Sequence, residues 1–220
     1  MRKILFTSYI CNQNDSFVQE IIREWAMLNP TYKIIYFSDN DVDLFFSETK
    51  YNETYKKMRN GVAKADFFRI CYINKYGGFW FDIDLKPLKI DILDAGGVRL
   101  FDAGYKNISY MFIGGDPSQK LFDDVIVAVE KNILDNIPEK KKHVMNITGP
   151  RIIQNILCGK LGIINKDGCL PGRKEGEIYL KGTDYEFIYQ KIVFSEHKTS
   201  LYQKLQKKYM KIEYQKYNFI

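Results

Sequence analysis

The pattern of apolar and polar positions predicts alternating strands and helices through the first half of the chain. Short apolar runs predict strands at residues 3–6, 33–37 and 79–83, the first and the last of them buried. A helix is predicted after the capping residues 14–16, with Ser16 and Gln19 at capping-box spacing, and it is predicted to end at Asn29-Pro30. A second helix is predicted from about residue 51 to residue 76, where Gly77 and Gly78 stop it.

The second half is less regular. Strands are predicted at 98–102 and 109–113, helices at 118–134, just after Gly149-Pro150 and at 199–214, and turns in the glycine-rich segment 159–186. No internal repeat or linker divides the chain. We therefore expect one α/β domain over 1–197, followed by a basic amphipathic helix over 198–220.

Composition narrows the class of protein. The chain has 220 residues, of which 45% are hydrophobic and 27% charged, so it is long enough and apolar enough to bury a core. No apolar run is long enough to span a membrane, and the first residues do not form a signal peptide. The four cysteines are widely spaced and predict neither a zinc site nor a disulfide framework. We expect a reduced, cytoplasmic protein.

The charge is concentrated at one end of the chain. The net charge is +6, and residues 198–220 hold six lysines against one glutamate, which leaves about +1 for the rest. In that tail an apolar stripe is formed by Leu201, Leu205, Tyr209 and Ile212. Such a helix either lies on an anionic membrane surface or packs on the body of the protein. A near-neutral body does not predict nucleic-acid binding.

The candidate chemistry centres on Asp82 and Asp84, which follow a buried apolar strand. Residues two apart on an extended chain face the same way, so the two carboxylates can share one divalent cation. The same pattern occurs at Asp39-Asn40-Asp41 and at Asp41-Val42-Asp43. Those copies imitate the start of a calcium loop but lack its glycine and its closing glutamate, so we interpret 39–43 as a solvated turn and helix start.

The context of Asp82 and Asp84 resembles a known signature. Residues 63–88 read AKADFFRICYINKYGGFWFDIDLKPL. They resemble the pattern A-x-x-(A/S)-D-x-x-R-x-x-x-L-x-x-x-G-G-x-(Y/W)-x-D-x-D-x-x-P-L of DXD-containing sugar transferases, with Ile73 at the usual leucine. These form the Och1-like, capsular-polysaccharide-type family, with clostridial glucosylating toxins as distant relatives. Weaker similarity covers the segments 2–9, 25–39, 148–150 and 194–200.

The resemblance implies a GT-A fold, which is a Rossmann-like, mixed but mainly parallel sheet flanked by helices. It also implies a hexosyl or N-acetylhexosaminyl transferase, with retention, that uses a UDP- or GDP-sugar and Mn²⁺ or Mg²⁺. The acceptor would be a glycan, a lipid-linked glycan or another hydroxyl compound, as in polysaccharide biosynthesis. It implies these site residues: Asp82, Asp84 and His197 for the metal, Asp66, Arg69 and Asp82 for the donor sugar, and Thr7, Tyr9 and Trp80 for the nucleotide.

Each assignment has a structural alternative. Asp66 and Arg69 could form an ion pair on a solvated helix face, and Trp80 could be a core residue of the strand. Thr7 and Tyr9 could be ordinary strand-end residues, and His197 a surface residue. Four further residues either line the site or serve the backbone, namely Gly77 and Gly78 at the helix stop and Thr148 and Gly149 at a helix start. No carboxylate identifies itself as a nucleophile, so the catalytic residue is not predicted.

Two other functions fit parts of the sequence. The segment FWFDIDL imitates the nucleophile motif of haloacid dehalogenase-type phosphatases. That motif requires threonine or glycine soon after the second aspartate and a strand near the chain start, whereas Leu85-Lys86-Pro87 follows here and about 80 residues precede. A basic module that binds membranes or nucleic acid is supported only by the tail.

Overall fold

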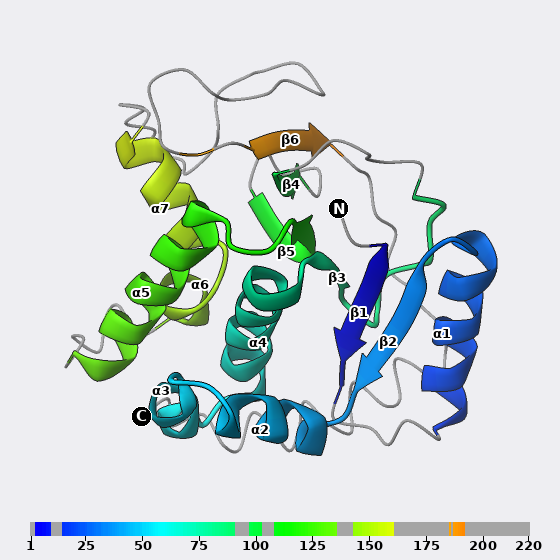
Figure 1. The fold of residues 1–220 in the computed structure, drawn as a ribbon, viewed down its shortest axis with the longest axis horizontal. Coiled ribbons are helices and arrows are strands. Elements are labelled where there is room, and N and C mark those ends of the chain that lie inside the picture. The colour runs from blue at the N-terminus through cyan, green and yellow to red at the C-terminus, as the bar shows by residue number, and fades with distance from the viewer. Residues whose placement is uncertain are drawn as a thin grey trace.

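A six-stranded sheet runs through the centre of the protein in the computed structural model (Figure 1). The structure describes residues 3–9, 15–90, 97–102, 108–135, 143–160, 185 and 187–191. The strands are β1 (Ile4–Ser8), β2 (Lys33–Phe37), β3 (Gly78–Phe81), β4 (Val98–Asp102), β5 (Ile108–Gly115) and β6 (Phe187–Lys191).

The strand order is β2-β1-β3-β5-β4-β6. Strand β1 pairs in parallel with β2 and β3, and β4 pairs in parallel with β6, whereas β5 runs antiparallel to both β3 and β4. The strand order reverses at β1, because β2 lies on one side of it and β3 on the other. In open α/β sheets, ligands bind beyond the carboxyl ends of the strands at such a reversal of strand order.

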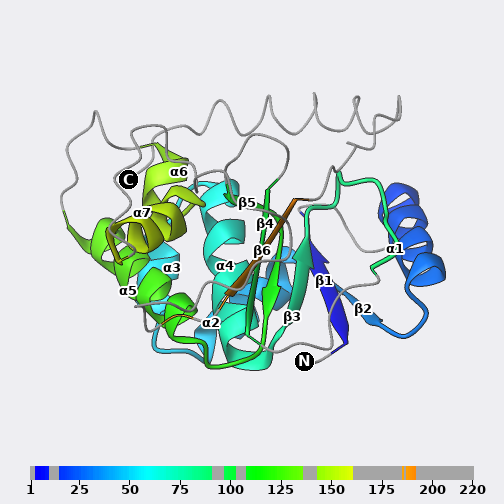
Figure 2. The same cartoon turned by 90° about the horizontal axis from the view of Figure 1, so that it is seen from above.

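Helices cover both faces of the sheet. They are α1 (Ser16–Leu28), α2 (Asp39–Ser47), α3 (Asn52–Lys57), α4 (Gly61–Tyr76), α5 (Lys120–Leu134), α6 (Val144–Ile147) and α7 (Arg151–Lys160). Among the described helices, α1 lies alone on one face, and the others lie on the opposite face (Figure 2). Among the described segments, no helix is both long enough and apolar enough to cross a membrane.

Two apolar cores result from the alternation of side chains along the strands. On β3, Phe79 and Phe81 point into the core under α1, whereas Trp80 points into the core shared with α4 and α5. Strand β3 is buried at every position, as its continuous apolar sequence predicts. The predicted α/β fold, a mixed, mainly parallel sheet flanked by helices, is confirmed.

Several predicted boundaries were wrong, and capping explains most of them. The cap of α1 is Asp15, which lies within the predicted capping residues 14–16 and whose carboxylate accepts a hydrogen bond from the Phe17 amide at 2.9 Å, so the predicted capping box of Ser16 with Gln19 was wrong. The helix predicted over 51–76 is two helices, because Asn60 accepts hydrogen bonds from the amides of Val62 and Ala63 and so begins α4 anew. The polar segment 39–43 does begin a helix, with a capping box between Ser38 and Asp41.

Two described elements were not predicted from the sequence, namely the short helix α6 and strand β6. The predicted helix at 199–214 lies outside the described residues, as do Cys11 and Cys169. Of the other two cysteines, Cys71 is buried and Cys158 is partly exposed.

Gly77 and Gly78 connect α4 directly to β3. Both have positive φ, at 73° and 109°, a region that side-chain-bearing residues rarely adopt. A Cβ on Gly78 would lie 2.9 Å from the carbonyl oxygen of Ile4. The pair thus ends the helix and lets β3 approach β1 closely, which sets the position of the residues that follow on β3.

Candidate functional site

Asp82 and Asp84 lie in a turn at the carboxyl end of β3, and not on an extended strand as predicted. The strand ends at Phe81, and the amide of Leu85 donates to the carbonyl oxygen of Asp82 at 3.0 Å, which closes the turn. The Asp82 amide still donates to the carbonyl of Met111 on β5 at 2.8 Å. Asp82 is therefore held by the sheet, whereas Asp84 occupies the turn, and both are partly exposed.

The two-residue period of the strand places Asp82 on the same side as Trp80. The indole Nε1 of Trp80 donates to Oδ1 of Asp82 at 2.6 Å. Trp80 itself is 2% exposed and packs against Phe6 and Phe68. For Trp80 the structure favours the alternative of a core residue, because protein atoms enclose the ring that the resemblance assigns to the nucleoside.

Arg69 connects the two predicted acidic groups. Its guanidinium lies 3.3 Å from Oδ1 of Asp66 and 3.1 Å from Oδ1 of Asp82. It also donates to the carbonyl oxygen of Tyr110 at 2.5 Å, and its guanidinium carbon lies 4.4 Å from the centroid of the Trp80 ring. The structure thus brings together Asp66, Arg69 and Asp82, which come from α4 and the end of β3.

This cluster is not a solvated ion pair, because Asp66 and Arg69 are each only 5% exposed. Burial raises the pKa of Asp66 to about 6, and the nearby Asp82 raises it as well, although Arg69 and the hydrogen bond from Thr148 act in the opposite direction. A carboxylate kept in so dry an environment is costly for the fold. Such groups are found preferentially at functional sites.

Thr148, at the end of α6, contacts the cluster through Asp66. It follows α6, is fully buried, and donates through Oγ1 to Oδ2 of Asp66 at 3.2 Å. Gly149 lies close to α6, where a Cβ would sit 2.7 Å from the Cα of Met145. Thr148 therefore contacts the predicted sugar-binding carboxylate, whereas Gly149 serves close backbone packing.

Tyr110 on β5 is a member of the cluster that the sequence did not reveal. It is 3% exposed, and its hydroxyl has no hydrogen-bond partner among the described residues. Burial, together with the nearby Asp66 carboxylate, raises the pKa of the Tyr110 hydroxyl well above its usual value. Only the alternation of β5 could have indicated its side, and nothing in the sequence indicated that β5 lies beside Asp66.

The other predicted site residues are placed less directly. Thr7 on β1 is fully buried, and its hydroxyl also lacks a partner in the described part of the chain. Tyr9 is partly exposed beyond β1 and its carbonyl accepts a hydrogen bond from the Tyr36 hydroxyl at 2.8 Å. His197 lies outside the described residues. The roles of Thr7 and Tyr9 in nucleotide binding remain predictions.

The donor set at the turn fits a hard divalent cation. Asp82 and Asp84 supply carboxylate oxygens, and Oδ2 of Asp82 takes no part in the contacts with Trp80 and Arg69. The described residues contain no group of three or more histidine, cysteine, aspartate or glutamate side chains that could hold a metal. A cation bound by one or two carboxylates and completed by phosphate oxygens and water is the usual arrangement for Mg²⁺ at phosphate sites.

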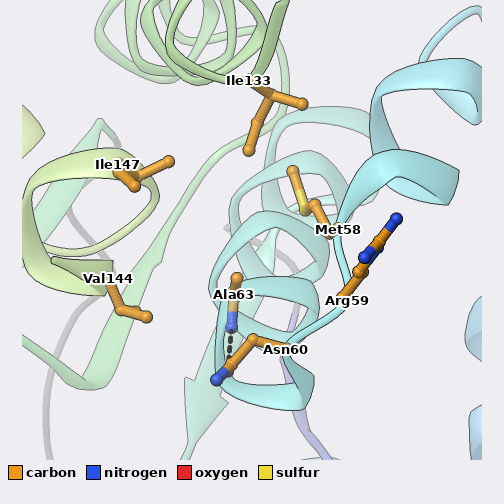
Figure 3. Close-up of a pocket in the computed structure, with 7 residues that line it drawn as sticks. All are labelled: Met58, Arg59, Asn60, Ala63, Ile133, Val144 and Ile147. Carbon is orange, nitrogen blue, oxygen red and sulfur yellow. Dashed lines mark hydrogen bonds between the residues drawn. The ribbon is translucent and has the colours of Figure 1, made fainter. Parts of the chain in front are cut away.

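A small apolar cavity lies apart from this cluster, between the start of α4, the end of α5 and α6 (Figure 3). Its volume is about 10 Å³, and its lining is mostly apolar, including Met58, Ala63, Ile133 and Ile147. Asn60, which caps α4 through the Ala63 amide, lies at its edge. A space of this size holds no more than about one water molecule, so it cannot accept a nucleotide or a sugar.

Comparisons with known proteins agree with this arrangement. Residues 15–94 match the family described as "Glycosyltransferase sugar-binding region containing DXD motif". Among solved structures, the chain is similar to "PaToxG Glycosyltransferase", with 15% sequence identity and a TM-score of 0.54 over 76% of this chain and 71% of that one. No curated protein matches the chain. The family match covers α1 to the end of the turn that holds Asp82 and Asp84, and the structural similarity extends over the fold.

Proposed function

We propose that the chain is a glycosyltransferase that transfers a hexose or N-acetylhexosamine from a UDP- or GDP-sugar to a hydroxyl acceptor, a reading supported by the match of residues 15–94 to a DXD-containing sugar-binding region. The acceptor would be a glycan or a lipid-linked glycan, and transfer would proceed with retention. The observation that supports this donor class is the Arg69 guanidinium, which contacts both Asp66 and Asp82 in one buried cluster.

The residues of the cluster suit a nucleotide-sugar donor in two ways. Buried carboxylate and guanidinium groups such as Asp66 and Arg69 bind sugar hydroxyls selectively, because a ligand that lacks the matching hydroxyl leaves a buried group unpaired. Asp82 and Asp84 lie at the partly exposed edge, where they would hold Mn²⁺ or Mg²⁺ against the diphosphate.

When bound, the cation stabilises the negative charge that develops on the leaving diphosphate. The chain's own contribution is positional. Arg69 fixes the orientation of Asp82 relative to Asp66, and the turn closed by Leu85 presents Asp84 beside it. No carboxylate in the described cluster identifies itself as a nucleophile, so no covalent intermediate is proposed.

The test is hydrolysis or transfer from UDP- and GDP-sugars, measured as release of the nucleoside diphosphate with Mn²⁺ and with EDTA. We expect EDTA to abolish release and Asp84→Ala to reduce it by at least about 10²-fold, because the substitution removes a charged cation ligand. Asp39→Ala is the matched control, since Asp39 belongs to a second Asp-x-Asp pattern but is exposed at the start of α2. Full activity of Asp84→Ala would contradict the metal assignment.

No observation favours the phosphatase alternative. We expect release of phosphate from simple phosphate monoesters to remain at background. Phosphate release without any nucleotide sugar, retained in the presence of EDTA and lost in Asp82→Asn, would contradict the proposed transferase reaction.

A further inference from the structure

The two tryptophans of the chain are both buried but differ in one respect. Trp25 on α1 has no hydrogen-bond partner for its indole Nε1 among the described residues. Trp80 donates from Nε1 to Oδ1 of Asp82 at 2.6 Å. A buried indole N–H usually has a partner, and here that partner is the carboxylate expected to bind the cation.

Two donors converge on the same oxygen of Asp82. Besides the indole of Trp80, Nη1 of Arg69 lies 3.1 Å from Oδ1. These two contacts fix the plane of the carboxylate and leave Oδ2 out of both. The Asp82 side chain is 27% exposed, whereas that of Arg69 is 6% exposed. A buried pair of donors therefore anchors a carboxylate at the edge of the site.

The Trp80 ring is itself immobilised. Arg69 lies over the ring at 4.4 Å, and the ring centroid of Phe6 is 5.6 Å away at a steep angle. At 2% exposure, the ring offers almost no surface to a ligand. The indole Nε1, and not the face of the ring, is the part of Trp80 that contacts Asp82.

We propose that Trp80 is a positioning residue whose indole N–H holds Asp82 by Oδ1, so that Oδ2 is presented to the divalent cation. It acts through Asp82 and does not pack against the nucleoside. This inference rests on the proposed function and deepens it. Groups that orient a metal ligand in this way raise metal affinity, and their loss typically weakens binding by roughly 10- to 100-fold.

The chain provides a matched pair of variants. Trp80→Phe keeps a buried aromatic ring but removes the N–H, so Oδ1 of Asp82 retains only Arg69. Trp25→Phe makes the same chemical change in the other core, where no hydrogen bond with a described residue is lost. A purely structural role for Trp80 would make the two variants alike in every readout except stability.

The measurement is calorimetric titration of Mn²⁺ into the full chain in the presence of UDP or GDP. We expect Trp80→Phe to weaken Mn²⁺ binding by about 10-fold or more, and Trp25→Phe to bind as wild type does. Higher Mn²⁺ should restore the activity of Trp80→Phe, because the apparent KM for the metal changes while kcat at saturation does not. Unchanged Mn²⁺ affinity in a folded Trp80→Phe variant would overturn the inference.

If Trp80→Phe does not fold, tryptophan fluorescence provides a second test of the inference. Trp25→Phe retains Trp80 as its single tryptophan, so its emission reports on the indole bound to Asp82. We expect diamagnetic Mg²⁺ with nucleotide to shift this emission, and an emission that does not change at saturation would overturn the inference. If wild type binds no Mn²⁺ with either nucleotide, it is the proposed function that fails.

Discussion

Asp66 is a carboxylate that the fold keeps away from water at a cost. Its pKa is raised to about 6, first by burial and then by Asp82, against the opposing effects of Arg69 and Thr148. The folded state therefore binds a proton that the unfolded chain, with a carboxyl pKa near 3.8, releases. Since the folded state binds more protons between these two values, stability decreases as the pH rises from about 4 to 6. A shift of this size corresponds to roughly 3 kcal/mol.

We predict that Asp66→Asn removes this pH dependence. Relative to wild type, the variant should become progressively more stable as the pH rises from about 4 to 7, because its amide carries no charge to bury. Urea unfolding of both proteins at several pH values measures the difference. A constant difference across this range would show that Asp66 titrates normally. The same variant should lose donor binding, which would link the cost of the buried charge to function.

At the residue scale, the sequence predicted which residues form the candidate site but not how they are arranged. The spacing of Asp66 and Arg69 correctly placed them on one side of a helix, and the aspartates after β3 were found by their context. Tyr110 could not be found, because its proximity to Asp66 depends on the antiparallel pairing of β5 with β3. The backbone at Asp82 was not predicted correctly, because the strand ends at Phe81 and the turn closed by Leu85 begins at Asp82.

The critical element is the junction of α4 and β3, because it carries residues of the cluster on both sides. Arg69 lies on the helix eight residues before Gly77, and Trp80 lies on the strand two residues after Gly78. Any displacement at the junction therefore changes the contact between Arg69 and Trp80. The junction itself was predictable, since two consecutive glycines after an apolar helix indicate a helix stop.

We predict that Gly78→Ala is strongly destabilising. The residue has a φ of 109°, and a Cβ would lie 2.9 Å from a carbonyl oxygen of β1, so both backbone strain and steric overlap result. The expected loss is about 2–4 kcal/mol in the free energy of unfolding, measured with urea. Gly159→Ala is the control, because its Cβ would meet no atom within 4 Å in α7 and should stabilise by about 0.5–1 kcal/mol. Equal stability of the two variants would contradict the assigned role of Gly78.

At the scale of elements, apolar patterns predicted most helices and strands correctly, whereas capping residues predicted the helix ends poorly. Strands β2 and β4 have the predicted bounds. The division between α3 and α4 was missed because a helical pattern of apolar residues continues across Asn60, and only its capping hydrogen bonds end one helix and begin another. Strand β6 was missed because its pairing with β4 spans a long interval of sequence.

For the whole molecule, the distribution of charge separates the site from the tail. The excess of the net charge of +6 lies in residues 198–220, and the body that holds the acidic cluster is nearly neutral. The predicted boundary between domain and tail and the predicted tail helix lie outside the described residues. The cytoplasmic location and the peripheral membrane contact remain predictions. The basic charge is therefore no guide to the donor substrate, and it leaves open whether the tail lies on a membrane surface or packs on the body.

We predict that the tail binds anionic membranes through its lysines. Replacing Lys204, Lys207, Lys208 and Lys211 by glutamine in the full chain should reduce sedimentation with phosphatidylserine-containing liposomes about as much as raising the salt concentration does for wild type. At roughly 1 kcal/mol per lysine near such a surface, four substitutions suffice to abolish binding. The matched control replaces four exposed lysines of the body by glutamine, namely Lys33, Lys56, Lys57 and Lys131. Both variants lose the same total charge, so equal reductions in sedimentation would show that net charge and not the tail attracts the membrane. If neither variant reduced sedimentation, the tail would be inferred to pack on the body instead.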